Sequence, residues 1–166
     1  MLTSTQITIL RVDILADSAF ASVPRTSDGD ETIADAYNAI VAPDYWVWRT
    51  RVTQSEIVGD ISVDATSWSW TLFINRSQGE RDGWREMFAD TGAVNASRAN
   101  VRQGFIDIFS GASGAAQRTH LLAMGRRKAT RGEKLFAAGA GSTLAPSTLS
   151  FEGLISGSDV SQARAN

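Results

Sequence analysis

The sequence predicts a mainly α fold: a compact helical bundle with a small β element around the tryptophan-rich segment and an extended C-terminal arm. Capping signals precede apolar residues at helical spacing through most of residues 1–138. Tryptophans recur at alternating positions between residues 46 and 70, and the tail is rich in Ser, Gly, Ala and Thr. With 166 residues, the chain has room for one ordinary domain. We expect a helical domain over residues 1–139 and an arm over residues 140–166.

The first helix is expected over about residues 3–17. Thr3 and Gln6 have the spacing of a capping box, and Ile7, Leu10 and Ile14 then fall on one helical face. Partial alternation of the apolar residues also fits a strand, but we favour the helix.

A second helix follows, capped by Ser27 or Asp28 and ended by Pro43. Its apolar residues are Ile33, Ala36, Tyr37 and Ile40. Its first turn carries the acids Asp28, Asp30 and Glu31. The helix dipole favours negative charge at this end, which explains these acids better than a cation site does.

The segment from residue 44 to 73 is the expected β element. Trp46 and Trp48, and again Trp68 and Trp70, have the i, i+2 spacing of one strand face. Irregular or short helical turns would place the same rings equally well. Thr53 and Glu56 indicate a brief helix between the two pairs.

Three more helices are expected before the tail. Ser77 and Glu80 form a capping box for a helix that Thr91-Gly92 ends. Asn95 or Ser97 caps the next, whose buried residues are Val101, Phe105, Ile108 and Phe109. A last long helix is expected over residues 115–138, with Gly125 and Gly132 marking a close approach by another helix.

The tail after Gly139 has a composition that rarely packs a core of its own. We therefore expect a partner chain to hold residues 140–166 in place.

Composition excludes several classes of site. The chain has no cysteine and one histidine, His120, which rules out disulfides, thiolate metal sites, cysteine nucleophiles and two-histidine metal motifs. Nucleotide-binding glycine loops and the serine-hydrolase elbow are also absent from the sequence. We expect His120 to have a capping or packing role. The sequence therefore predicts no catalytic residue, no cofactor, no metal and no enzyme.

No secretory signal or long apolar segment is recognisable, so we expect neither export nor membrane insertion.

Charge is distributed unevenly along the chain. Residues 1–64 hold ten acids and four arginines, whereas residues 65–166 hold eight acids and twelve bases. The halves can balance each other within one fold or meet different neighbours in an assembly. Arginine outnumbers lysine fourteen to two, a preference that suits interface ion pairs.

The strongest local charge feature is a basic cluster on the expected last helix: Arg118, Arg126, Arg127, Lys128, Arg131 and Lys134. Arg127, Arg131 and Lys134 would share one helical face. Such a face can bind another subunit, read a nucleic acid, pair with the acidic N-terminal half, or simply be a solvated surface. We favour subunit contacts. The apolar residues that we expect to contact a partner are Trp46, Trp48, Leu149, Phe151, Leu154 and Ile155.

Several runs of residues resemble a family of small proteins from the structural-gene modules of tailed bacteriophages and prophages. These runs are residues 42–50, 52–57, 100–111 and 126–136, followed by 139–143 and 146–148. The resemblance implies a virion protein assembled in the host cytoplasm. It carries over no catalytic residue.

Within that setting we expect a head–tail connector or adaptor that forms a homo-oligomeric ring and docks on the portal through its arm. DNA would pass through such a ring without sequence-specific binding. A tail or baseplate component is the alternative, as is a DNA-binding or packaging protein that uses the basic residues 118–134.

Overall fold

The computed structural model describes residues 1–59 and 63–165 and confirms the mainly α fold class. About 53% of the chain is helical, in nine α-helices among the described residues, with only small two-stranded sheets. The chain divides into two compact units, one formed by residues 1–47 and 128–166 (unit 1) and one by residues 48–127 (unit 2). The chain passes from one unit to the other within β1, Trp46–Trp48, and returns within β4, Arg126–Lys128. Asp60, one of the ten N-terminal acids, lies outside the described residues.

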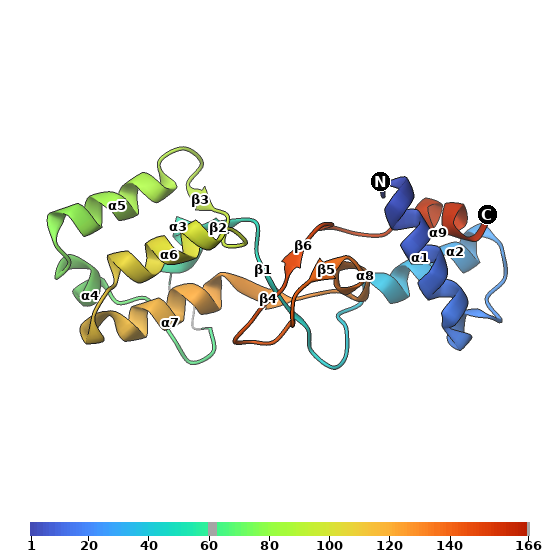
Figure 1. The fold of residues 1–166 in the computed structure, drawn as a ribbon, viewed down its shortest axis with the longest axis horizontal. Coiled ribbons are helices and arrows are strands. Elements are labelled where there is room, and N and C mark those ends of the chain that lie inside the picture. Colours follow the sequence, from blue (N-terminus) through green and yellow to red (C-terminus); the bar gives the residue numbers. More distant parts are fainter. Residues whose placement is uncertain (60–62, 166) are drawn as a thin grey trace. The chain divides into compact units, whose positions relative to one another are not determined.

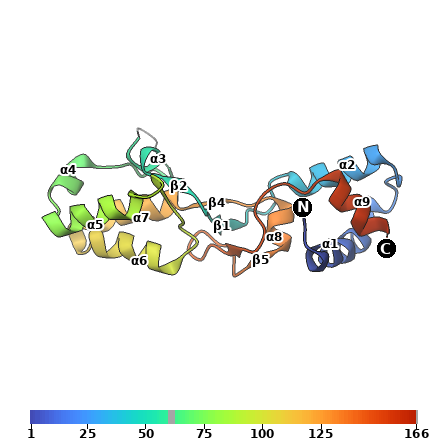
Figure 2. The same cartoon turned by 90° about the horizontal axis from the view of Figure 1, so that it is seen from above.

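Unit 1 is built on three helices that are distant in sequence. α9 packs against both α1 and α2 (Figure 1 and Figure 2). A short helix, α8, also contacts α2. The elements of this unit are α1 (Ser4–Ala16), the 3-10 turn η1 (Ser18–Phe20), α2 (Ser27–Asn38), α8 (Arg131–Leu135), β5 (Ala137–Ala138), β6 (Thr148–Leu149) and α9 (Gly157–Ala165). β5 and β6 pair antiparallel, with Ala137 opposite Leu149.

The core of unit 1 joins the two ends of the chain. Ile7, Leu10 and Ile14 of α1 are buried, as their spacing predicted. They share one cluster with Ile33 and Tyr37 of α2. The remaining buried members of the cluster are Leu2, Phe20, Ala34, Phe136, Ile155, Val160 and Ala163.

The expectation that the tail packs no core is therefore wrong. Val160 and Ala163 of α9 are fully buried, and Ile155 is 1% exposed. Arg164 adds a nearly buried ion pair to Asp30 of α2 at 2.6 Å. The side-chain amide of Asn38 donates to the Ile155 carbonyl and accepts from its N–H, both at 2.8 Å. Small side chains let α9 approach α1 and α2 closely, so the chain's own helices hold this segment.

Unit 2 surrounds an aromatic core. Its elements are β2 (Val52–Thr53), α3 (Gln54–Val58), α4 (Trp70–Ile74), α5 (Gln78–Phe88), β3 (Ala93–Val94), α6 (Ala99–Ile108), the 3-10 turn η2 (Ala112–Gly114) and α7 (Ala115–Met124). β2 and β3 pair antiparallel, with Val52 opposite Val94. Trp84 is 1% exposed, and its ring centroid lies 4.7 Å from that of Phe88 and 5.0 Å from that of Trp68.

Local capping signals located most helices correctly. The capping boxes Thr3–Gln6, Thr53–Glu56 and Ser77–Glu80 all form at the starts of helices. Residues 46–48 form a strand, as the spacing of Trp46 and Trp48 predicted. Trp68 lies in a loop and Trp70 begins α4, so the strand predicted from Trp68 and Trp70 is wrong.

Some helix ends differ from the prediction. Thr26, one residue before the expected cap, caps α2, which ends at Asn38 and leaves Ile40 outside the helix. α6 begins directly after Arg98, which makes no side-chain cap, so the predicted cap at Asn95 or Ser97 is wrong.

The predicted long helix over residues 115–138 is also wrong. α7 ends at Met124, residues 126–128 form β4, and α8 begins after Thr130. A Cβ on Gly125 would lie 3.1 Å from the Ala96 Cβ, and the Gly125 carbonyl accepts from the Arg49 N–H at 2.8 Å. Thr130 and Glu133 then form a capping box that starts a new helix. Long-range packing at Gly125 and a second start signal at Thr130 divide the segment.

Candidate functional site

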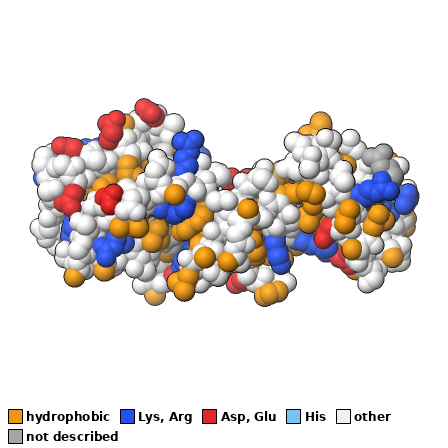
Figure 3. Space-filling view, in the orientation of Figure 1, with side chains coloured by type: hydrophobic (Ala, Val, Ile, Leu, Met, Phe, Trp, Pro, Cys, Tyr) orange, Lys and Arg blue, Asp and Glu red, His pale blue; other side chains and the backbone are white. Residues whose placement is uncertain are grey.

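The outer face of α1 exposes several apolar side chains on the unit 1 surface. α1 buries Ile7, Leu10 and Ile14, yet Ile9, Val12 and Leu15 on its other side are exposed, Val12 by 63%. Hydrophobic side chains lie at the surface in the part of the space-filling view where Figure 1 draws α1 (Figure 3). A groove of about 310 Å³ runs beside Val12, lined by Thr8, Ile9, Val12, Asp13, Ala16 and Leu135. We call this surface the α1 groove.

A charged cluster borders the α1 groove. The Arg131 guanidinium binds Asp13 at 2.8 Å and Asp17 at 2.7 Å. It also lies over the Tyr37 ring, 4.6 Å from the centroid. The Tyr37 hydroxyl donates to Asp13 Oδ2 at 2.5 Å. Arg131 is thus fixed by two carboxylates and an aromatic face, and it anchors α8 to α1.

The charge states of Tyr37 and Asp17 in this cluster fit a structural role. Burial raises the pKa of Tyr37, and the hydrogen bond to Asp13 raises it further. The Ala19 N–H and then Arg131 lower the pKa of Asp17. Tyr37 is therefore neutral and Asp17 ionised at neutral pH, so neither is poised to transfer a proton.

A second hollow, of about 540 Å³, adjoins the α1 groove and shares Asp13 and Leu135 with it. It is lined by Asp13, Asp17, Val41, Ala42, Arg131, Lys134 and Leu135. The Lys134 ammonium lies 5.5 Å from the Tyr45 ring centroid, and among the described residues it makes no ion pair. Lys134 is exposed and remains available to an acidic group on a partner.

Unit 2 also exposes an apolar surface, on α4. Trp70 and Ile74 are four residues apart, on one side of this short helix, and both are exposed, Ile74 by 61%. The Trp70 ring meets Trp68 edge to face at 5.6 Å, which attaches it to the aromatic core. We call Trp70 and Ile74 the α4 knob.

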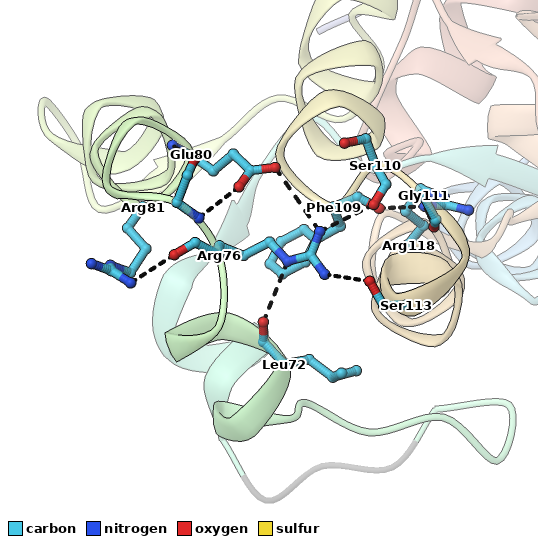
Figure 4. Close-up of polar contacts among 10 residues, drawn as sticks. Leu72, Arg76, Glu80, Arg81, Phe109, Ser110, Gly111, Ser113 and Arg118 are labelled. Atoms are coloured by element: carbon cyan, nitrogen blue, oxygen red, sulfur yellow. Dashed lines mark hydrogen bonds and ion pairs between the residues drawn. The ribbon is translucent and has the colours of Figure 1, made fainter.

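Arginine side chains connect the C-terminal end of α4 to α5 and to the segment that joins α6 and α7. Arg76 donates to the Ser110 carbonyl at 3.0 Å and to Ser113 Oγ at 2.9 Å (Figure 4). Arg81 donates to the Ile74 carbonyl at 2.8 Å, and Arg118 donates to the carbonyls of Phe109 and Gly111. One carboxylate, Glu80, approaches Arg76, at 3.9 Å. These bonds hold the backbone of α4 in place beside the α4 knob.

His120 belongs to the interior of unit 2. Its ring is fully buried, with Nε2 3.1 Å from the Ile57 carbonyl oxygen and Nδ1 3.1 Å from Thr66 Oγ1. These bonds tie α7 to α3 and to the turn at Thr66. Within the described residues, no group of three or more His, Cys, Asp and Glu side chains is placed to hold a metal ion.

The predicted basic cluster does not form one helical face. Arg118 lies on α7, Arg126, Arg127 and Lys128 on β4, and Arg131 and Lys134 on α8. Arg126 pairs with Asp64 at 2.7 Å, Lys128 with Asp44 at 2.8 Å, and Arg131 with Asp13 and Asp17. All four acids come from residues 1–64, so pairing between the acidic and basic parts of the chain neutralises much of the cluster.

The apolar residues expected at a partner contact differ in exposure. Trp46, Trp48, Leu149 and Phe151 are half-buried. Arg102 lies over the Trp48 ring at 4.5 Å, and Phe151 meets Phe136 edge to face at 5.6 Å. Leu154 is 73% exposed, whereas its neighbour Ile155 is in the core. Ile155 therefore cannot serve as a surface contact in this fold.

None of the residues that line the α1 groove was among the predicted contact residues, although their apolar pattern is visible in the sequence. Ile9, Val12 and Leu15 recur every three residues between the buried positions, which makes α1 apolar on both sides. A helix with apolar residues on two sides is typical of one that packs against neighbours on both.

None of the helices in the described ranges is long and apolar enough to cross a bilayer. Comparison with known proteins gives no family, because no protein-family model, no curated protein and no solved structure matches the chain.

Proposed function

We propose that this chain is a non-enzymatic structural protein of a tailed-phage virion, a head–tail connector or adaptor subunit that assembles through the α1 groove. The observation that carries the proposal is the second apolar face of α1, at Ile9, Val12 and Leu15. The resemblance of residues 42–50, 100–111 and 126–136 to phage structural-module proteins supplies the virion setting.

An uncovered apolar helix face is unfavourable in water. Removing apolar surface from water contributes about 25 cal/mol per Å², so a face of this kind favours association. Exposed apolar patches beside polar residues are typical of protein contact sites. Lys134, beside the groove, can add a polar contact to an acidic partner residue.

A structural role also accounts for the ionisable residues near the candidate surfaces. Asp13 and Asp17 hold Arg131, and His120 connects buried elements. Each of these groups is engaged in stabilising the fold, which supports a protein that acts by binding.

Docking through a free C-terminal arm is not part of the proposal, because Ile155, Val160 and Ala163 are core residues of unit 1. A DNA-reading helix over residues 118–134 is not favoured either, since that segment is divided among α7, β4 and α8. A tail or baseplate component would use the same α1 groove with a different neighbour.

The test is the mass of the purified chain in solution, by light scattering at rising protein concentration. We expect a mass above the 17.8 kDa of one chain, approaching a fixed multiple. Val12→Lys should return the protein to one chain. Ile40→Lys, at another exposed apolar position of unit 1 (56%), should assemble like the unsubstituted chain.

A chain that stays monomeric at every concentration, alone and with the portal and tail proteins of the same genome, would contradict the proposal. Binding to portal distinguishes a connector, whereas binding to tail proteins alone identifies a tail component.

A further inference from the structure

We propose that the occupant of the α1 groove is the α4 knob of a second copy of this chain, so that copies join head to tail. This inference rests on the proposed function and names the partner of its assembly surface. It stands on two uncovered apolar surfaces, one on each unit, and on the opposite net charges of the units.

The two surfaces are of complementary kinds. The α1 groove is a hollow with almost entirely apolar lining. The α4 knob projects one tryptophan and one isoleucine from a single helix turn. Tryptophan is among the residues that most often anchor a protein interface, and it does so by filling a pocket on the partner.

Charge favours a contact between unlike units. By sequence, unit 1 holds ten acids and six bases, a net charge of −4, whereas unit 2 holds eight acids and ten bases, a net charge of +2. A unit 1 to unit 1 contact would bring two negative units together, whereas unit 1 to unit 2 brings opposite charges together.

Such a contact is heterologous, because each copy contributes a different surface. Heterologous contacts generate closed rings when the rotation between copies closes, and open filaments when it does not. The inferred contact therefore supplies the kind of interface that a connector ring requires.

The experiment uses two variants of the full chain, each disabled at one surface. Val12→Lys places a cation in the groove, and Ile74→Glu places an anion on the knob. Each side chain is more than half exposed, so each variant is expected to fold. The matched controls are Ile40→Lys in unit 1 and Ile106→Glu in unit 2, at other exposed isoleucines. Circular dichroism and thermal unfolding of every variant establish that the fold is kept.

We expect each variant alone to have the mass of one chain, and an equimolar mixture to reach at least twice that mass. The knob of the Val12→Lys copy is intact and fits the intact groove of the Ile74→Glu copy. The controls should assemble like the unsubstituted chain. Association should weaken as salt rises from 0.05 M to 0.5 M, since the Debye length is about 10 Å at 0.1 M and shortens as salt is added.

Two results would overturn the inference. If Ile74→Glu assembles normally while Val12→Lys does not, the groove has another occupant, such as the α1 of a second copy, and the proposed function survives. If both variants are monomeric and their mixture remains monomeric, the two surfaces do not meet. A monomeric unsubstituted chain, with or without its virion partners, would remove the proposed function itself, and so would a Val12→Lys variant that assembles normally.

Discussion

Ile155 provides the sharpest test of whether the C-terminal segment belongs to the core of unit 1. Ile155→Ala removes three carbons from a side chain that is 1% exposed, and Leu154→Ala removes three carbons from the adjacent side chain, which is 73% exposed. The pair matches in position and in the number of carbons removed. Only burial differs.

The magnitude follows from transfer and cavity terms. Three buried carbons at about 0.8 kcal/mol each give about 2.4 kcal/mol. An unfilled residual cavity of about 50 Å³ adds about 1.2 kcal/mol, for a total of about 3.5 kcal/mol. The Asn38 hydrogen bonds to the Ile155 backbone survive the substitution, so the loss reports packing. Leu154→Ala should change stability by less than about 0.5 kcal/mol.

The assay is hydrogen exchange read by mass spectrometry across a urea series, following peptides from α1, α2 and α9. With a urea dependence of about 1.5 kcal/mol per M, Ile155→Ala should lower the midpoint of these peptides by about 2 M. Equal midpoints for Ile155→Ala and Leu154→Ala would refute the placement of the tail in the core.

Three further predictions concern Gly132, Glu56 and Thr130. A Cβ on Gly132 would lie 2.6 Å from Ile155 Cδ1, so Gly132→Ala should destabilise the native protein, and by less when Ile155→Ala is also present. Burial raises the pKa of Glu56, but hydrogen bonds from Arg49 and Thr53 outweigh it and hold the pKa at about 2, against an ordinary 4.5. Because the pKa of Glu56 is lowered in the folded state, the stabilisation that its carboxylate contributes is complete above pH 4.5 and is lost as the pH falls toward 2. The difference in unfolding midpoint between the native chain and Glu56→Gln should therefore shrink over that range. Thr130→Ala should cost about 1 kcal/mol and speed amide exchange in α8, because it removes the cap.

Each of these has its own control and contrary result. The control for Gly132→Ala is Gly79→Ala on α5, where a Cβ meets nothing within 4 Å and the substitution should stabilise the protein. If Gly132→Ala lowers the free energy of unfolding equally with Ile155 and with Ile155→Ala, the proposed clash with Ile155 is wrong. A Glu56→Gln difference that is constant from pH 6 to pH 2 would show that the carboxylate is not stabilised by folding. Thr5→Ala, at an exposed position of α1, should leave exchange unchanged, and the cap assignment fails if Thr130→Ala does the same.

The candidate surfaces were only partly predictable. The alternation of apolar residues in α1 was visible in the sequence, but the side that faces the core is fixed by α2 and α9. The α4 knob was not predictable, because Trp68 and Trp70 have strand spacing, yet Trp68 joins the Trp84 cluster and Trp70 begins a helix.

Local signals in the sequence specify the fold class and the starts of most helices. A capping box such as Thr3–Gln6 or Ser77–Glu80 is complete within four residues, so its physics is local and can be read directly from the sequence.

Contacts between distant residues set where the segment after residue 115 breaks and where the tail packs. Gly125 ends α7 through contacts with Arg49 and Ala96, and Gly132 is small because Ile155 packs against it. These contacts join residues that are distant in sequence, and their free energy exists only once both partners are in place. The ion pairs of Arg126 and Arg131 likewise form only in the folded chain, because their acidic partners lie more than sixty residues away in sequence.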